Sequence, residues 1–208
     1  MIPGFFRFPA VLKPVYGNAI YRLKQGGNKV YLSFDDGPTS RGTREIISVL
    51  KKNGVNHAVF FCTGSNIEKY PGSFSEIKSN GFTVANHGYL HLDGWKTARK
   101  NYIDNCTKGS EITNSLFFRP PYGHMMPGQY NILKKTHRIV FWDLLLYDWD
   151  MSVNSDTIIG KIRKLVRPGS VIALHDRENM CALRVLDDII DICKSRGFTF
   201  GDLTVEAI

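Results

Sequence analysis

Two adjacent carboxylates, Asp35 and Asp36, end an alternating apolar run and are followed at once by Gly37 and Pro38. The run, residues 29–32, is typical of a buried strand, and the glycine and proline are typical of the turn that ends it. Such a pair can divide work, with one carboxylate binding a metal ion and the other taking a proton from water. Since Asp is also common in ordinary turns, other residues must decide between a site and a loop.

Two histidines, His87 and His91, are four residues apart. On a helical turn this spacing places both rings on one side, where they can share a metal ion; the alternative is a pair of surface residues. A carboxylate from the first strand end would complete a set of two histidines and one carboxylate, which leaves positions open for water and substrate. Zinc is the expected metal, and cobalt, nickel, manganese and iron fit the same ligands.

Two further side chains suit acid–base chemistry. His175 follows the apolar run 171–174 and has no packing reason to end a buried strand. We expect it to be the acid that protonates a leaving group, with a neutral core histidine as the alternative. Arg119 precedes two prolines that fix the backbone. An arginine beside a base would keep that base ionised, and the alternative is a surface salt bridge.

Strands and helices are expected to alternate along the chain. Expected strands cover residues 29–32, 57–62, 82–85, 116–118, 138–142, 171–174 and 198–203, and expected helices cover residues 41–52, 74–79, 95–114, 129–135, 156–166 and 182–196. Short apolar strands separated by helices imply parallel pairing. About seven such units without a glycine-rich phosphate-binding fingerprint favour a closed or nearly closed α/β barrel over a doubly wound sheet.

In either architecture, functional groups gather just after the carboxyl ends of strands. Five expected strand ends carry ionisable residues, namely Asp35 and Asp36, His87 and His91, Arg119, Asp143 with Asp148, and His175. This convergence favours one catalytic site over a set of unrelated loops.

The bulk composition is that of a globular protein. A chain of 208 residues, 43% of them apolar, can form one domain with a sizeable core. Its formal net charge of +8 favours anionic partners without requiring any. Because no recognised nucleic-acid-binding module is present, nucleic acid is not an expected partner. No feature of the sequence indicates an oligomeric state.

The first 27 residues contain no apolar segment long enough for a signal peptide or a membrane span, so a cytoplasmic location is expected. The segment combines four basic residues and no acidic one with five aromatic residues. We expect these aromatic side chains to pack over one end of the domain, and peripheral contact with a membrane surface is the alternative. The four cysteines lack CxxC spacing and are expected to be free thiols.

Five ordered motifs resemble those of the polysaccharide deacetylases, the NodB-homology domain of carbohydrate esterase family 4. They are Ser33-Phe34-Asp35-Asp36-Gly37-Pro38, His87-x-x-x-His91, Arg119-Pro120-Pro121-Tyr122, Asp148-Trp149 and Leu174-His175, and the resemblance runs from about residue 29 to 203. It implies a distorted (β/α) barrel with about seven parallel strands in residues 29–208. Residues 1–28 would be an N-terminal extension that packs on this catalytic domain.

The resemblance also implies a role for each motif residue. Asp36, His87 and His91 would bind the metal ion. Asp35 would be the general base and His175 the general acid.

The remaining motif residues would support these five. Arg119 would orient the base, and Asp148 would pair with the acid. The backbone N–H of Tyr122 would help hold the tetrahedral oxyanion. Trp149 and Leu174 would form the apolar slot for the acetyl methyl group.

Gly88 stands where the family usually has Ser or Thr, so a hydroxyl that could brace the histidine loop is missing. Weaker or more mobile metal binding is therefore expected. Three histidines lie outside the motifs. His124, beside the site, either touches substrate or is solvent-exposed, and the second interpretation is favoured. His57 is expected at the entry of a strand and His137 in a loop.

The implied activity is that of a metal-dependent hydrolase that removes N-acetyl groups from an N-acetylated sugar or polysaccharide, of the chitin-oligomer, peptidoglycan or N-acetylglucosamine-conjugate type. A metal-bound water would attack the amide carbonyl, with the Asp base and the His acid moving the protons. The alternatives are hydrolysis of another non-peptide C–N bond and a non-catalytic protein that binds a glycan or an anionic surface. A base, its orienting arginine and an acid together favour the enzyme.

Overall fold

In the computed structural model, seven parallel strands form one curled sheet in the order β5-β4-β3-β2-β1-β7-β6, and an eighth strand, β8, pairs with β1. The structure describes residues 6–23, 25, 27–150, 152–178 and 181–207. The strands are β1 (Lys29–Asp35), β2 (Val59–Cys62), β3 (Thr83–Asn86), β4 (Phe117–Phe118), β5 (Arg138–Ile139), β6 (Leu144–Leu145), β7 (Val171–His175) and β8 (Thr199–Phe200). The expected distorted (β/α) barrel with about seven parallel strands is confirmed.

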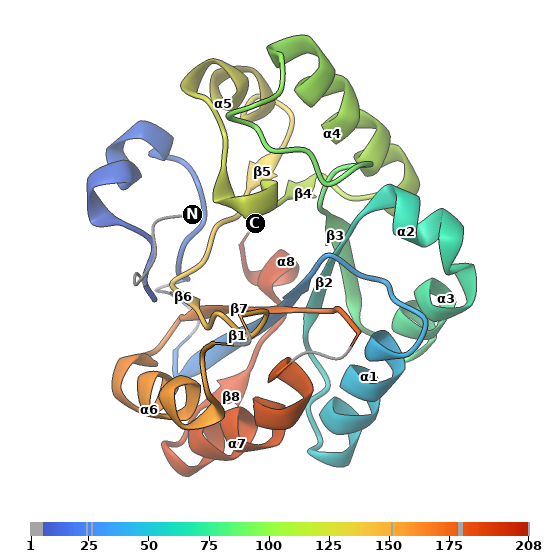
Figure 1. The fold of residues 1–208 in the computed structure, drawn as a ribbon. Coiled ribbons are helices and arrows are strands. Elements are labelled where there is room, and N and C mark those ends of the chain that lie inside the picture. Colours follow the sequence, from blue (N-terminus) through green and yellow to red (C-terminus); the bar gives the residue numbers. More distant parts are fainter. Residues whose placement is uncertain (1–5, 24, 26, 151, 179–180, 208) are drawn as a thin grey trace.

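Helices surround the strands, as Figure 1 shows. They are α1 (Gly42–Lys52), α2 (Gly64–Lys69), α3 (Pro71–Ser79), α4 (Arg99–Thr113), α5 (Pro127–Leu133), α6 (Ser155–Leu165) and α7 (Cys181–Ser195). The described part of the chain also contains the 3-10 helices η1 (Ala10–Tyr16) and η2 (Pro121–Gly123) and the final helix α8 (Leu203–Glu206).

Strand β1 is buried along nearly its whole length because it pairs with β2, β7 and β8. Successive side chains of a strand point to opposite faces of the sheet. Leu32 and Phe34 accordingly pack in the core between the sheet and the outer helices, while Tyr31 packs in the cluster inside the barrel. The same alternation puts Asp35, at the carboxyl end of β1, on the inner face.

Helix α8 lies inside the ring of strands (Figure 1). Leu203 packs there against Tyr31 and the inner side chains of neighbouring strands. Glu206 accepts hydrogen bonds from the Tyr31 hydroxyl at 2.8 Å and from Lys29 Nζ at 3.0 Å. These contacts fill the barrel interior below the carboxyl ends of the strands.

The sheet stays open between β5 and β6, and residues 6–23 lie along this opening between α5 and α6 (Figure 1). Phe141 N donates to Ile20 O at 2.8 Å, and Leu145 N donates to Phe6 O at 2.8 Å. Phe8 packs against Phe141 with ring centroids 4.5 Å apart. The N-terminal segment thus contacts both edges of the sheet. Among the described residues, no helix is both long and apolar enough to cross a membrane.

Some elements differ from the expectation. Helix α2 and strand β6 were not predicted, because α2 has only Ile67 as a large apolar residue and β6 is two residues long. Helix α4 begins at Arg99 instead of residue 95. Residues 87–91 form an irregular loop and not a helical turn. Cys62, Cys106 and Cys193 are buried free thiols, as expected.

Candidate active site

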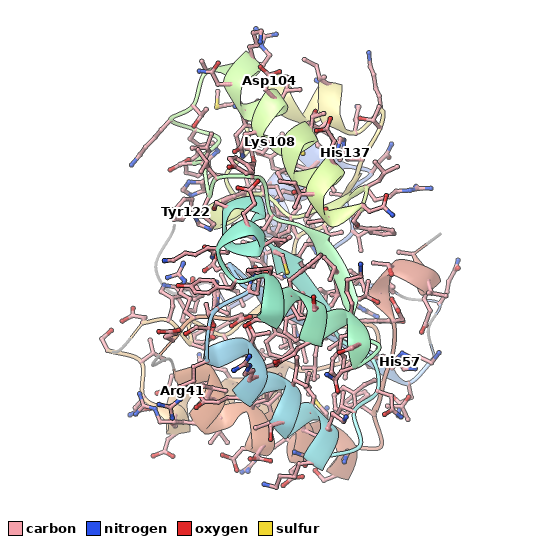
Figure 2. The ribbon with its side chains drawn as sticks, turned by 90° about the vertical axis from the view of Figure 1, so that its right-hand side faces the viewer. Arg41, His57, Asp104, Lys108, Tyr122 and His137 are labelled. Atoms are coloured by element: carbon pink, nitrogen blue, oxygen red, sulfur yellow. The ribbon has the colours of Figure 1, made fainter. Side chains whose placement is uncertain are left out.

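A cleft of about 610 Å³ opens at the carboxyl ends of the strands. Its lining includes Asp35, Asp36, His87, His91, Tyr122, Trp149 and His175. Figure 2 shows Tyr122, which follows β4, and His57, which precedes β2, on opposite sides of the molecule, left and right. The prediction that the motif residues meet at one end of the barrel is thus confirmed for these seven residues.

Asp36, His87 and His91 form the tightest cluster in the cleft. Asp36 Oδ1 lies 2.9 Å from His91 Nε2 and 3.3 Å from His87 Nε2. One ligand atom from each of the three residues lies within 4.8 Å of the others, close enough to hold one metal ion. His87 Nδ1 lies 2.8 Å from the carbonyl oxygen of Arg119, which can only accept a hydrogen bond. Nδ1 therefore donates to this oxygen, and Nε2 is the ring nitrogen that faces the cluster.

Among the described residues, one carboxylate oxygen of this cluster lacks a hydrogen-bond donor, whereas Arg177 pairs with the other. Asp36 Oδ1 is buried and has no hydrogen-bond partner in the described part of the chain. Burial opposes ionisation of Asp36, but the adjacent imidazoles of His87 and His91 outweigh this and hold its pKa well below the usual range. Burial lowers the pKa of His91, which favours its neutral, metal-binding form. A carboxylate oxygen and two imidazole nitrogens therefore fit a divalent metal ion here.

Contacts around the first motif fix the position of Asp36. Asp36 has a positive φ of 78°. Its carbonyl oxygen accepts hydrogen bonds from Asn66 Nδ2 at 2.7 Å and Thr63 Oγ1 at 3.3 Å. A Cβ atom on Gly37 would lie 2.2 Å from Oδ2 of Asp176, so only glycine fits at this position. Close contacts on both sides of the turn, with Asn66 and Thr63 on one and Asp176 on the other, thus explain the Asp36-Gly37 sequence of the first motif.

Asp176 is the buried carboxylate that this turn packs on. It accepts hydrogen bonds from Thr39 Oγ1 at 2.8 Å and Thr43 Oγ1 at 2.6 Å. Burial raises its pKa to about 6. These hydrogen bonds tie Asp176, which follows His175, to the loop between β1 and α1 through Thr39 and to the first turn of α1 through Thr43.

The histidine loop is braced by asparagines and not by a hydroxyl. Gly88 has a φ of 83°, and its N–H donates to Asn86 Oδ1 at 2.7 Å. Asn105, on α4, accepts from Leu90 N at 2.6 Å and donates to Leu90 O at 2.9 Å. These bonds hold the residue next to His91. The expectation of weaker metal binding at Gly88 stays a prediction, and these supports argue against it.

Asp35 is held by a buried arginine. Arg119 Nη1 donates to Asp35 Oδ1 at 2.6 Å and to Ser33 Oγ at 2.8 Å. Its Nη2 donates to the carbonyl oxygen of Phe141 at 3.1 Å, and its guanidinium lies 4.0 Å from the ring centre of Phe61. Arg119 is fully buried, so the alternative of a surface salt bridge is wrong. Asp35 and Asp36 thus have different partners although they are neighbours.

His175 pairs with Asp148. Its Nδ1 lies 2.8 Å from Asp148 Oδ1, and its backbone N–H donates to Oδ2 at 2.8 Å. Burial disfavours the charged imidazole, but the charge of Asp148 and its hydrogen bond, with the charges of Asp36 and Asp35, outweigh this and raise the pKa of His175. The ring of Trp149 lies edge-on to His175 at 4.3 Å. The pairing of His175 with Asp148, implied by the resemblance, is present.

Leu174 does not line the cleft. It is fully buried in the core between the sheet and the outer helices, on the opposite face of β7 from His175. Leu145 lines the cleft together with Trp149. The structure therefore contradicts the expected place of Leu174 as a wall of the acetyl slot.

Two other side chains differ from the expectation. His124 is 8% exposed, because its ring stacks on Trp95 with centroids 3.6 Å apart. Asp143 lies away from the cleft, where it pairs with Arg7 and Arg167 near the amino end of β7. His57 and His137 lie before β2 and after α5, as expected.

Sequence reasoning also missed Arg177, which is charged and contacts Asp36, a predicted metal-binding residue. It lines the cleft, and its Nε donates to Asp36 Oδ2, which leaves Oδ1 toward the two histidines. The signal for it was its place two residues beyond His175, in the loop that follows β7.

Comparisons with known proteins agree with this geometry. The sequence model of the polysaccharide deacetylase family matches residues 22–137. The peptidoglycan-N-acetylglucosamine deacetylase of Bacillus cereus is 34% identical over 185 residues, which cover 84% of this chain and 66% of that protein. The peptidoglycan-N-acetylmuramic acid deacetylase PdaA of Bacillus subtilis is 30% identical over 201 residues, which cover 89% of this chain and 74% of that protein.

A solved structure shows the same fold. A peptidoglycan N-acetylglucosamine deacetylase, crystallised with a naphthyl-substituted N-hydroxybenzamide, superposes with a TM-score of 0.83 at 31% identity. The superposition covers 91% of this chain and 92% of that one. With the family match extending over more than half of its residues, the chain belongs to the polysaccharide deacetylase family.

Proposed function

We propose that the protein is a metal-dependent hydrolase that removes the N-acetyl group from a sugar of a glycan, releasing acetate and leaving a free amine. The observation that carries this proposal is the separation of two adjacent carboxylates. Asp36 faces His87 and His91, whereas Asp35 is bonded to Arg119, and both line the cleft that contains His175. The named relatives are peptidoglycan deacetylases, which supports a sugar N-acetyl group as the target.

We take the metal ion to be Zn²⁺, held by Asp36, His87 and His91; Co²⁺, Ni²⁺, Mn²⁺ and Fe²⁺ suit the same ligands. Such an ion, when bound, lowers the pKa of water and polarises a carbonyl group. The ion pair between Arg177 and Asp36 Oδ2 supports the proposal, because it directs the other carboxylate oxygen toward the histidines.

Asp35 is the proposed general base. Its carboxylate, which accepts a hydrogen bond from Arg119, takes a proton from the attacking water. The three hydrogen bonds of the Arg119 guanidinium fix that carboxylate in one orientation.

His175 is the proposed general acid. Asp148 Oδ1 accepts a hydrogen bond from Nδ1–H, so the other ring nitrogen delivers its proton to the departing amine nitrogen. The raised pKa of His175 keeps the imidazole protonated at higher pH than an ordinary histidine.

Tyr122 and two apolar residues complete the proposed site. Tyr122 follows two prolines and has a φ of 59°, and we assign its backbone N–H to the oxyanion. Trp149 and Leu145 form the proposed slot for the acetyl methyl group.

The test is acetate release from peptidoglycan fragments, chitin oligomers and N-acetylglucosamine conjugates, before and after removal of metal by a chelator. We expect chelation to abolish release and one or more of the five metals to restore it. Release that continues unchanged in the chelated protein would contradict the proposal. A metal-loaded protein that binds these glycans without releasing acetate would be a non-catalytic binding protein.

A further inference from the structure

His137 is a buried histidine that the proposed mechanism does not use. It is 8% exposed and lies against α4 (Figure 2). Each of its ring nitrogens faces a hydroxyl group, since Nδ1 lies 2.9 Å from Thr136 Oγ1 and Nε2 lies 2.9 Å from Ser110 Oγ. Burial lowers the pKa of His137, which favours the neutral imidazole, in which one nitrogen donates and the other accepts. The ring is therefore held by hydrogen bonds on both sides.

Ser110, on α4, connects His137 to the end of β3. Its Oγ accepts a hydrogen bond from Asn86 Nδ2 at 2.7 Å. Nδ2 also donates to the carbonyl oxygen of Cys106 at 2.8 Å, and Asn86 Oδ1 accepts from the backbone N–H of Gly88 at 2.7 Å. Because a carbonyl group only accepts and a backbone N–H only donates, these two bonds fix the orientation of the Asn86 amide. A chain of hydrogen bonds thus runs from His137 to Gly88.

This chain of bonds reaches the residues on both sides of His87, a proposed metal ligand. Asn86, which is fully buried, precedes His87, and Gly88 follows it. Residues 87–91 form an irregular loop, so the repeated hydrogen bonds of a helix or strand do not fix its shape. A metal ligand must nevertheless lie within about 0.2 Å of its proper distance from the ion. The bonds made by Asn86 can supply that precision from both sides of His87.

Gly109 lets α4 come close enough to make these bonds. A Cβ atom at position 109 would lie 2.3 Å from Asn86 Oδ1 and 2.7 Å from the carbonyl carbon of Gly88, so only glycine fits there. Glycine is otherwise unfavourable inside a helix, which indicates a packing reason for it at this position. The contact brings the backbone of α4 directly against the histidine loop.

We infer that Ser110 and His137 are positioning residues for the metal-binding site, and that they hold the His87 loop in place through Asn86. The inference rests on the proposed function. Gly88 lacks the hydroxyl that the family usually has in this loop, and Ser110 supplies a hydroxyl from α4 instead. His137 in turn fixes the direction of the Ser110 hydroxyl. Removing a group that orients a metal ligand typically weakens metal binding, whereas removing a purely structural group lowers stability alone.

The test compares Ser110→Ala with Ser110→Thr, which keeps a hydroxyl at the same position. Zn²⁺ affinity is measured by competition with a fluorescent chelator, and urea unfolding of the metal-free protein is followed in parallel. We expect Ser110→Ala to weaken Zn²⁺ binding about tenfold or more, and Ser110→Thr to retain most of the affinity.

Thr113→Val is the matched control, because the buried Thr113 hydroxyl donates to the carbonyl oxygen of Gly109 within α4, at 2.8 Å. This variant should lower the midpoint of urea unfolding and leave Zn²⁺ affinity unchanged.

His137→Phe keeps a ring but removes both nitrogens, so it should also weaken Zn²⁺ binding. Because His137 acts through Ser110, the double variant should bind Zn²⁺ no more weakly than Ser110→Ala alone. Losses of affinity that add in the double variant would contradict the role assigned to His137.

The inference is overturned if Ser110→Ala binds Zn²⁺ as tightly as the wild type, or if Ser110→Thr loses as much affinity as Ser110→Ala. A wild-type protein that binds no Zn²⁺ would overturn both this inference and the proposed metal site. A wild-type protein that binds Zn²⁺ but releases acetate from no glycan would overturn the proposed activity and leave the measured differences in affinity as they are.

Discussion

Arg119 Nη1 lies 2.6 Å from Asp35 Oδ1, and both side chains are almost completely withdrawn from solvent. This ion pair links β1 to the loop after β4 across the inside of the barrel. A buried charge that loses its partner is costly, so the pair couples the stability of the fold to the position of Asp35, the proposed base.

Arg119→Met should therefore both unfold more easily and lose activity. Removing the guanidinium leaves Asp35 buried without its partner, which we expect to lower the free energy of unfolding by about 3–5 kcal/mol. Urea unfolding followed by circular dichroism measures this. If the urea unfolding curve of Arg119→Met has the same midpoint and slope as that of the wild type, the pair of Arg119 and Asp35 contributes nothing to stability.

Arg44→Met provides the comparison for that experiment. Arg44 forms an ion pair with Glu76 on the exposed surface, at 2.9 Å. Because solvent screens such pairs, Arg44→Met should lower the free energy of unfolding by only about 0–1 kcal/mol.

Asp148→Asn should change the dependence of the rate on pH. The Asp148 charge raises the pKa of His175, so its removal lowers that pKa. The acid form is lost as pH rises through the pKa, so the alkaline fall of kcat/KM should move to lower pH in the variant. The profile of Asp104→Asn, altered at an exposed residue of α4 labelled in Figure 2, should match the wild type. If the pH profile of Asp148→Asn also matches that of the wild type, His175 is not the acid.

Gly88→Ser should weaken metal binding, although it restores the hydroxyl that the family usually has. A Cβ atom there would lie 2.6 Å from Asn105 Nδ2, and the φ of 83° is strained for serine. We expect metal affinity to fall about tenfold, as for 1–2 kcal/mol of strain. Competition with a fluorescent chelator measures the affinity directly.

Asn105→Ala tests the same contact between Asn105 and the histidine loop by changing the asparagine. It removes the clash but also both hydrogen bonds to Leu90. Metal affinity should fall in the single variant Asn105→Ala. Adding Gly88→Ser to Asn105→Ala should lower metal affinity by a smaller factor than adding it to the wild type. Additive effects would show that Gly88 and Asn105 act independently.

Much of the site could be predicted because chemistry-bearing residues stand directly after recognisable strands. Asp35, Asp36 and His175 end buried apolar runs, and parallel strands bring their carboxyl ends together. The side of the sheet that each residue faces was harder to predict. Both faces of β7 are buried, so its apolar run alone does not show which face is the inner one. Alternation along the strand does place Leu174 on the opposite face from His175, and the expectation that followed the resemblance overlooked this.

Other misplaced residues depended on contacts distant in sequence. The burial of His124 depends on Trp95, 29 positions earlier, and on the loop that Gln129 fixes. Asp143 was expected at the carboxyl ends of the strands, but its partners Arg7 and Arg167 lie in other parts of the chain. No local pattern identifies such pairings.

The division of labour between Asp35 and Asp36 is tested most directly by measuring metal content and acetate release in Asp35→Asn and Asp36→Asn side by side. Asp35→Asn should retain one metal ion per chain with wild-type affinity and lose activity by about a hundredfold or more. Asp36→Asn should lose the metal ion itself. Loss of metal from Asp35→Asn, or acetate release by it at the wild-type rate, would contradict the account.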